Sequence, residues 1–383
     1  MFMCYENCEV GYVRIQWIEF ENIETGLKIE RVDFFEDITL LVGLSGVGKT
    51  QILNAVEYSL KLAVNKDIVL QPYRVSMGIK IEHSIYEWSY QIGDTPESEL
   101  ILANEKKYSF TAEKLVCDGE MVFERTNSIT LVKGYDKVPQ PKSDESLLLQ
   151  YAEDDTFKKL IDGIRKMYSV EMEIAVRGGI RSDIFSSIKA KVVDTIRREK
   201  NTSFEMFSHL PVAVKIFIAK KYYQDIYEQM FLAVQELFME IEDIDIVEDT
   251  TKEIYLVAIK VYGKQLLQHD ISNGMLKTIY YIVELFTMSK DSLVLIDEFE
   301  NGLGVNCIDV LSDLLLHQRN DLQFIITSHH PKIINGIEKN RWKIIDRDAS
   351  VVKNSSSQEY GIGNSQHDAY FNLLNRWEFE GKA

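Results

Sequence analysis

The segment Gly43-Leu44-Ser45-Gly46-Val47-Gly48-Lys49-Thr50 decides the expected fold, because it fits the pattern G-x-x-x-x-G-K-[ST]. The run 37–42 before it is rich in β-forming residues, and residues 51–64 after it carry an apolar side chain at every fourth position. We therefore predict a strand, a phosphate-binding loop and a helix. Backbone N–H groups of the loop would surround a phosphate, Lys49 would reach the β- and γ-phosphates, and Thr50 would bind magnesium.

A second candidate element is the apolar run 293–296, which ends in Asp297 and Glu298. Such a run is typical of a buried parallel strand, and the carboxyl end of such a strand faces the crevice where ligands bind. In that position Asp297 would hold magnesium through water, and Glu298 would act as the general base that polarises the attacking water.

Residues 270–277 form a third candidate, on the N-terminal side of the acidic strand. Ser272 is expected to cap the helix that follows, and Gly274 lets an anion approach the exposed N–H groups at the start of that helix. By itself, this pattern is also typical of an ordinary helix cap.

A fourth candidate is the polar turn after the predicted strand 324–327; this turn contains His329 and His330. A histidine there could contact a γ-phosphate or fix the attacking water. We favour His329 for this role and keep His330 as the alternative.

The rest of the chain predicts an α/β fold whose core is split by an insertion. Residues 13–20 read as a strand, and residues 76–131 alternate as antiparallel strands do. Residues 145–242 read as several broken helices without a heptad run, and strands and helices alternate again afterwards. The predicted segments are an N-terminal lobe, a helical insertion and a C-terminal lobe, with the bounds 1–140, 141–240 and 241–383.

The four motifs, in their order along the chain, resemble those of the ABC-type ATPase heads of the SMC, RecF-like and OLD families. Residues 272–275 are similar to the S-x-G-M form of the ABC signature, residues 297–303 to a Walker B and D-loop, and residues 327–331 to a switch histidine motif. The resemblance covers roughly residues 10–135 and 240–350. It implies a core sheet that carries the P-loop, an antiparallel β subdomain, ATP and Mg²⁺ as ligands, and ATP hydrolysis.

The chain departs from that family at several points. Ser45 stands where SMC-like heads commonly carry asparagine, and neither Gln140 nor Gln150 is a convincing Q-loop glutamine. The long coiled coil of SMC proteins is missing, and no room is left after the core for the TOPRIM nuclease of OLD proteins. The arrangement resembles PtuA-like or AriA-like ATPase subunits of the Septu and PARIS anti-phage systems.

The resemblance implies a homodimer or higher homo-oligomer, because the signature of one copy must face the nucleotide of another. It also implies a separate effector protein, a nuclease or a toxin. Two alternatives stay open. One is a RecF-like or SMC-like DNA-associated repair ATPase, supported by the basic run 189–200 and by Lys215, Lys220 and Lys221. The other is the nucleotide-binding subunit of a transporter.

Composition narrows these alternatives. The formal charge of −17 repels a nucleic-acid backbone at long range, so DNA contact would need a local basic surface. No uninterrupted apolar run is long enough for a membrane helix, and the start of the chain lacks the basic residues of a signal peptide. We expect a cytoplasmic protein with no membrane contact.

The four cysteines are sparse, which favours reduced thiols. A zinc site at Cys4 and Cys8 would lack a second cysteine pair.

Overall fold

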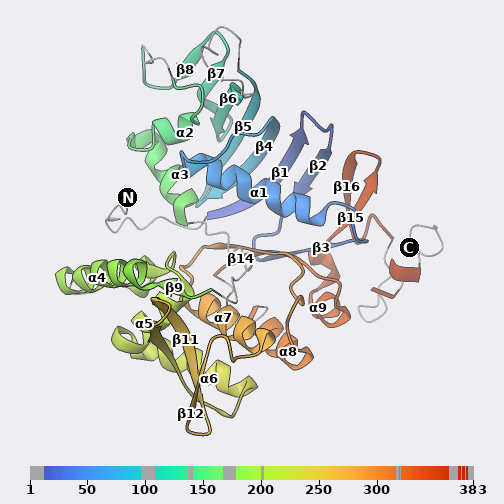
Figure 1. The fold of residues 1–383 in the computed structure, drawn as a ribbon. Coiled ribbons are helices and arrows are strands. Elements are labelled where there is room, and N and C mark those ends of the chain that lie inside the picture. Colours follow the sequence, from blue (N-terminus) through green and yellow to red (C-terminus); the bar gives the residue numbers. More distant parts are fainter. Residues whose placement is uncertain are drawn as a thin grey trace. The chain divides into compact units, whose positions relative to one another are not determined.

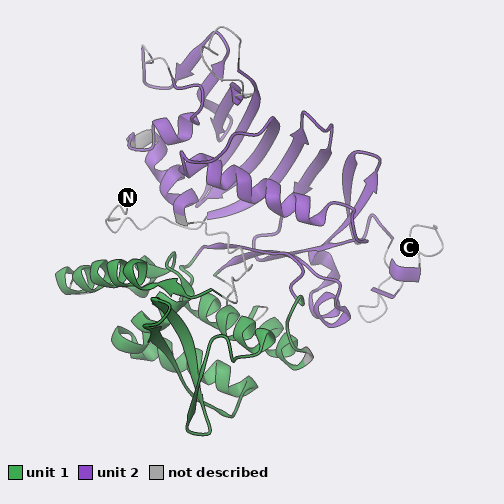
Figure 2. Ribbon diagram, viewed as in Figure 1, with its two compact units in different colours: residues 1–6, 171–290, 300–321 green, residues 7–170, 291–299, 322–383 purple. Residues whose placement is uncertain are grey.

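The protein is described from a computed structural model, shown in Figure 1. The described residues are 13–95, 108–136, 138, 141–166, 178–199, 202–315, 319, 321–361, 370–371, 373–375 and 377. Figure 2 shows that the chain divides into two compact units, each built from several chain segments. Unit 1 comprises residues 1–6, 171–290 and 300–321, and unit 2 comprises residues 7–170, 291–299 and 322–383.

Unit 2 contains a 12-stranded sheet whose parallel part carries the motifs. Neighbouring strands there are β13 (Leu293–Ile296), β14 (Gln323–Thr327), β3 (Ile38–Val42) and β15 (Trp342–Asp348), and each pair is parallel. All residues of β13, β14 and β3 are buried, which explains their predominantly apolar sequences. The carboxyl ends of these strands therefore meet at one edge of the sheet.

The same sheet continues through mostly antiparallel strands. The order after β15 is β16 (Val351–Ser356), β2 (Lys28–Asp33), β1 (Val13–Asn22), β4 (Tyr73–Ile81), β5 (Ser84–Asp94), β6 (Tyr108–Cys117), β7 (Glu120–Thr126) and β8 (Thr130–Val132). Only β16 and β2 pair in parallel in this part. The alternating burial of β4 and β5 matches the period of two in their sequences.

A buried side chain joins two parts of this sheet. The Gln323 amide donates from Nε2 to the Ile15 carbonyl at 2.8 Å and to the Phe35 carbonyl at 2.9 Å, and its Oε1 accepts from Ile15 N at 2.9 Å. This side chain thus pairs with the main chain of β1 much as a strand would, and it ties the start of β14 to β1.

The helices of unit 2 pack on this sheet. They are α1 (Lys49–Val64), α2 (Leu147–Gln150), α3 (Asp155–Lys166) and α9 (Pro331–Gly336), with a short 3-10 turn, η4 (Lys339–Arg341). Figure 1 shows α1 lying across the sheet, and its apolar face contacts β13 and β14. The start of α1 is thereby held next to the carboxyl ends of both strands.

Unit 1 is a separate α/β body. Its sheet has the order β10 (Ile241–Asp249), β11 (Ile254–Val261) and β12 (Lys264–Leu267), and β9 (Ile180–Arg181) also pairs with β11. Its helices are α4 (Ser182–Arg198), η2 (Phe204–Phe207), α5 (Val212–Tyr222), α6 (Gln224–Leu237), α7 (Asn273–Thr287) and α8 (Val305–Asp313). The helix α7 is central, since it contacts η2, α5, α6 and α8.

A buried ion pair ties α5 to α7. Lys215 Nζ donates to Glu284 Oε2 at 2.5 Å, and both side chains are nearly inaccessible to solvent. Burial lowers the pKa of Lys215 and raises the pKa of Glu284, because each charged form is removed from water. Removing either side chain would leave the other charged group buried without a partner, which lowers the stability of the fold.

The predicted α/β class is confirmed, and the strand–loop–helix unit and the antiparallel strands lie where the sequence placed them. The short strands β9 and β12 and the strands β2 and β16 were not predicted. The predicted segment 141–240 contributes to both compact units, and its bounds stay a prediction. No described helix combines the length and the apolar character needed to cross a membrane.

Candidate functional site

The glycine-rich loop connects the end of β3 to the start of α1. Gly46 has φ of 81° and Gly48 has φ of 113°, both in the left-handed region that favours glycine. A Cβ on Gly43 would lie 2.5 Å from the Ile345 carbonyl oxygen, and one on Gly48 would lie 2.6 Å from Val352 Cγ2. Positive φ therefore favours glycine at Gly46 and Gly48, and close packing favours glycine at Gly43 and Gly48.

Lys49 lies at the first position of α1 with only 6% of its surface exposed. Its Nζ donates to the Gly43 carbonyl at 2.8 Å and to the Leu44 carbonyl at 2.9 Å. The ammonium group is thus held inside the loop, where a lysine that contacts phosphates is expected to be.

Asp297 receives hydrogen bonds from the first turn of α1 and from the end of β14. Thr50 Oγ1 donates to its Oδ2 at 2.6 Å, and Thr327 Oγ1 donates to its Oδ1 at 2.6 Å. The predicted convergence of Thr50 and Asp297 is therefore present in unit 2. A hydroxyl and a carboxylate are hard oxygen ligands of the kind that Mg²⁺ prefers, so these residues fit a magnesium ion that is shared with phosphates.

Glu298 has an unusual backbone that is fixed by the same threonine. Its φ is 46°, a left-handed conformation uncommon for a residue with a side chain, and its main-chain N donates to Thr327 Oγ1 at 2.7 Å. The next residue, Phe299, is fully buried, and its N donates to the Thr327 carbonyl at 3.0 Å. The Glu298 side chain is exposed at the site, where a general base would need to reach water.

Thr327 bonds to both acids of the site, and the sequence assigned no separate role to it. It is the last residue of β14, fully buried, and its single hydroxyl serves both acids, donating to one and accepting from the main chain of the other. A polar residue directly after the buried apolar residues 324–326 was the available signal.

The histidine turn lies between β14 and α9. His330 N donates to Ser328 Oγ at 3.0 Å, and its Nδ1 is buried without a hydrogen-bond partner among the described residues. The His329 carbonyl accepts a hydrogen bond from the Tyr370 hydroxyl at 3.3 Å, a contact that the sequence did not suggest. His329 and His330 therefore both stay candidates for the predicted role.

The signature-like turn lies in unit 1 at the start of α7. Ser272 caps the helix as predicted, and its Oγ accepts from Met275 N at 3.3 Å. A Cβ on Gly274 would lie 3.2 Å from the Gly302 carbonyl, and Lys277 Nζ donates to the Asn301 carbonyl. The segment that follows the acidic motif thus packs on the first turn of α7, while Ser272 itself is exposed.

Other sequence candidates have local roles or lie outside the description. Gln150 Nε2 donates to the carbonyls of Lys142 at 3.2 Å and Glu145 at 2.9 Å, and Gln140 lies outside the described residues, as do Cys4 and Cys8. Within the part of the chain that is described, no group of three or more His, Cys, Asp or Glu side chains is placed to hold a metal ion.

The structure corrects the reading of the basic residues. Lys215 is fully buried against Glu284, and Lys220 forms ion pairs with Asp243 at 2.7 Å and Asp245 at 3.1 Å. These two lysines therefore do not form an exposed basic surface, although sequence alone allowed it.

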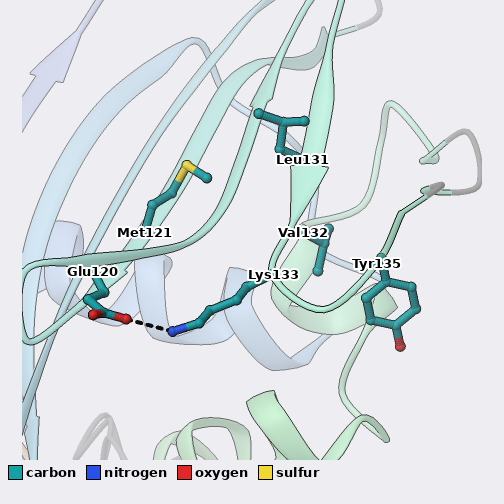
Figure 3. A pocket seen from close by; sticks show the side chains of 6 residues that line it. All are labelled: Glu120, Met121, Leu131, Val132, Lys133 and Tyr135. Carbon is teal, nitrogen blue, oxygen red and sulfur yellow. Dashed lines mark hydrogen bonds and ion pairs between the residues drawn. The ribbon is translucent and has the colours of Figure 1, made fainter.

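Figure 3 shows a hollow elsewhere on the molecule, at the β8 end of the sheet in unit 2. Its volume is about 510 Å³, and it is lined by Glu120, Met121, Leu131, Val132, Lys133 and Tyr135. Two of the lining residues, Glu120 and Lys133, form an ion pair of 2.7 Å. None of the predicted site residues lines it, so the hollow is separate from the site.

Comparison with known proteins gives one family match. Residues 178–335 match the model of the family described as "AAA domain, putative AbiEii toxin, Type IV TA system". This segment contains the signature-like turn, the acidic strand and the histidine turn, whereas the glycine-rich loop precedes it. No curated protein matches the chain.

Several solved structures are similar in fold. An SMC head bound to the C-winged helix domain of ScpA is 12% identical with a TM-score of 0.46, covering 89% of this chain and 96% of that one. The SMC head domain from Thermotoga maritima is 11% identical with a TM-score of 0.42, covering 90% and 98%. An Smc head domain bound to the C-terminal domain of ScpA from Pyrococcus furiosus is 13% identical with a TM-score of 0.44, covering 95% and 99%. Similarity at this level says nothing about ligands or partners of this chain.

Proposed function

We propose that this chain is an ABC-type ATPase that binds Mg·ATP at the loop 43–50 and hydrolyses it between two copies of itself. The observation that carries the proposal is the hydrogen-bonded group of Thr50, Asp297 and Thr327, which lies at the end of the loop that holds Lys49. A P-loop, a metal-binding acid and a neighbouring exposed acid together form the set that phosphoryl transfer to water requires.

The proposed roles follow from the contacts. Lys49 and the loop N–H groups would bind the β- and γ-phosphates, and Thr50 and Asp297 would hold the magnesium ion, which supplies charge neutralisation during transfer. Glu298 would accept a proton from the attacking water, because its carboxylate is exposed next to Asp297. His329, or His330 in its place, would orient that water or contact the γ-phosphate.

The exposed Ser272 turn supports the proposal of a dimer. Its N–H groups begin a 15-residue helix, and Ser272 and Asn273 at that helix start are exposed, so an anion could approach from solvent. In an ABC-type assembly this turn would face the nucleotide of a second copy.

A separate effector, such as a nuclease or a toxin in anti-phage defence, is the partner that the resemblance suggests. The DNA-repair alternative has less support, since two of its lysines are used inside unit 1.

The test compares two variants of the loop and the acids. Lys49→Ala is expected to abolish Mg·ATP binding, measured by titration calorimetry. Glu298→Gln is expected to keep binding and to lose about 10²–10⁴-fold in turnover, the usual contribution of a general base. With Mg·ATP, Glu298→Gln should also accumulate as a dimer in mass photometry, because hydrolysis no longer reopens the interface.

The control is Glu87→Gln, which alters an exposed glutamate on β5 of the same sheet, outside all four motifs, and should bind and hydrolyse ATP as wild type does. Equal loss of ATP affinity in Lys49→Ala and Glu298→Gln would contradict the assigned roles. A Glu298→Gln protein whose mass does not change with nucleotide would contradict the dimer.

A further inference from the structure

The hairpin formed by β15 and β16 touches the glycine-rich loop at each of its three glycines. The Ile345 carbonyl packs on Gly43, and the Val352 side chain packs on Gly48. At the third glycine the contact is polar, since Arg347 Nη1 donates to the Gly46 carbonyl at 3.4 Å. The parallel pairing of β15 with β3, with Ile344 opposite Val42, brings the hairpin to this place.

Arg347 is oriented by a second bond at the hairpin turn. Its Nε donates to the Ala349 carbonyl at 2.9 Å, so both bonds of the guanidinium go to main-chain oxygens. The nearby Asp348 is paired with Lys353 at 2.9 Å, and the Asp346 carboxylate accepts from Arg347 N at 2.8 Å. The guanidinium is thus held over the loop by neutral carbonyls.

Arg347 contacts the carbonyl of the peptide between Gly46 and Val47, and the N–H of the same peptide points away from Arg347. The Gly46 carbonyl and the Val47 N–H belong to one peptide unit, and there are no cis peptide bonds among the described residues. In a trans peptide the C=O and the N–H point to opposite sides. When the carbonyl faces Arg347, the Val47 N–H points away from Arg347, and it is one of the loop N–H groups that would surround a phosphate.

We propose that Arg347 is a positioning residue for nucleotide binding. Its guanidinium fixes the Gly46–Val47 peptide with the N–H turned towards the phosphate, and its charge polarises that peptide, so that the N–H becomes a stronger donor. The effect is on binding of the phosphates, of ATP and ADP alike, and not on the proton transfer. This inference rests on the proposed nucleotide site.

The experiment measures the Kd for Mg·ATP and Mg·ADP by calorimetry with wild type, Arg347→Gln and Arg347→Lys. We expect Arg347→Gln to raise both Kd values roughly five- to tenfold, the usual net contribution of one exposed hydrogen bond. Arg347→Lys should recover part of the affinity because it keeps the charge. In steady state, KM should rise while kcat stays within about twofold of wild type.

Salt provides an independent readout. The guanidinium is exposed, so the gap in Kd between wild type and Arg347→Gln should shrink as ionic strength rises to about 1 M, where charges are screened beyond roughly 3 Å. The matched control is Arg31→Gln, which removes an exposed arginine of the same sheet that pairs with Asp33 at 2.9 Å. Its Kd should equal that of wild type.

The outcomes separate the two proposals. If wild type binds no Mg·ATP, the proposed function itself is wrong. If wild type binds and Arg347→Gln binds equally well, or if Arg31→Gln weakens binding to the same extent, the role of Arg347 is overturned. A fall in kcat at unchanged KM would overturn it as well. Thermal unfolding of each variant checks the fold, and Arg347→Lys decides the question if Arg347→Gln fails to fold.

Discussion

The edge of the large sheet beside the loop 43–50, here called the loop end, and the first turn of α7 differ in how far apart in the chain their bonded residues lie. At the loop end, Thr50 and Asp297 are 247 positions apart in the chain, and Thr327 adds a third segment. At the first turn of α7, Ser272 is bonded to Met275, three positions away. The first arrangement exists only when several strands are in register, whereas the second forms wherever the helix forms.

This difference shows where each part is vulnerable. A substitution of Thr327 should disturb several polar groups at the loop end together, because its hydroxyl bonds to both Asp297 and Glu298. A change at the tip of α7 should stay local, since the helix is held from its other end by the buried pair Lys215–Glu284. Three substitutions test these expectations.

The largest expected effect is on the anchor of α7. Lys215→Met should lower the free energy of unfolding by about 3–5 kcal/mol, because it leaves the Glu284 carboxylate buried without its partner. The measurement is urea unfolding followed by circular dichroism. The double variant Lys215→Met/Glu284→Leu should recover most of the loss, since no buried charge remains. A single variant as stable as wild type would show that α7 is not held by this pair.

The next effect is at the loop end. Thr327→Val keeps the shape but removes a hydroxyl that serves Asp297 and Glu298, and we expect a loss of about 1.5–3 kcal/mol in unfolding free energy together with weaker Mg²⁺-dependent ATP binding. Thr287→Val is the matched control, because its buried hydroxyl bonds only to carbonyls of its own helix. Equal Mg²⁺ dependence in both variants would rule out the role given to Thr327.

The smallest effect is at the tip of α7. Ser272→Ala should cost about 1 kcal/mol, the usual value of an N-cap, and should lower ATP turnover while binding to the loop is kept. Ser203→Ala removes a comparable cap, at the start of η2 in the same unit, and should leave turnover unchanged. If both variants hydrolyse ATP at the wild-type rate, the tip of α7 takes no part in the reaction.

Local sequence patterns were sufficient to predict many of the helices, strands and loops of this molecule. Glycine spacing placed the loop 43–50, apolar runs placed β13 and β14, and a serine before an apolar helix placed the cap of α7. Each of these depends on residues close together in the chain, where backbone geometry and side-chain period act directly. Short edge strands such as β9 escaped, because two residues carry no period.

The remaining features depend on contacts between distant segments, which no local pattern contains. The burial of Lys215, the double role of Thr327 and the position of Arg347 over Gly46 each require a partner from another element. A lysine reads as a solvated residue until a carboxylate from another helix is found beside it, and a threonine at a strand end reads as ordinary. Sequence thus named the chemical groups, and strand register and helix packing decided which of them meet.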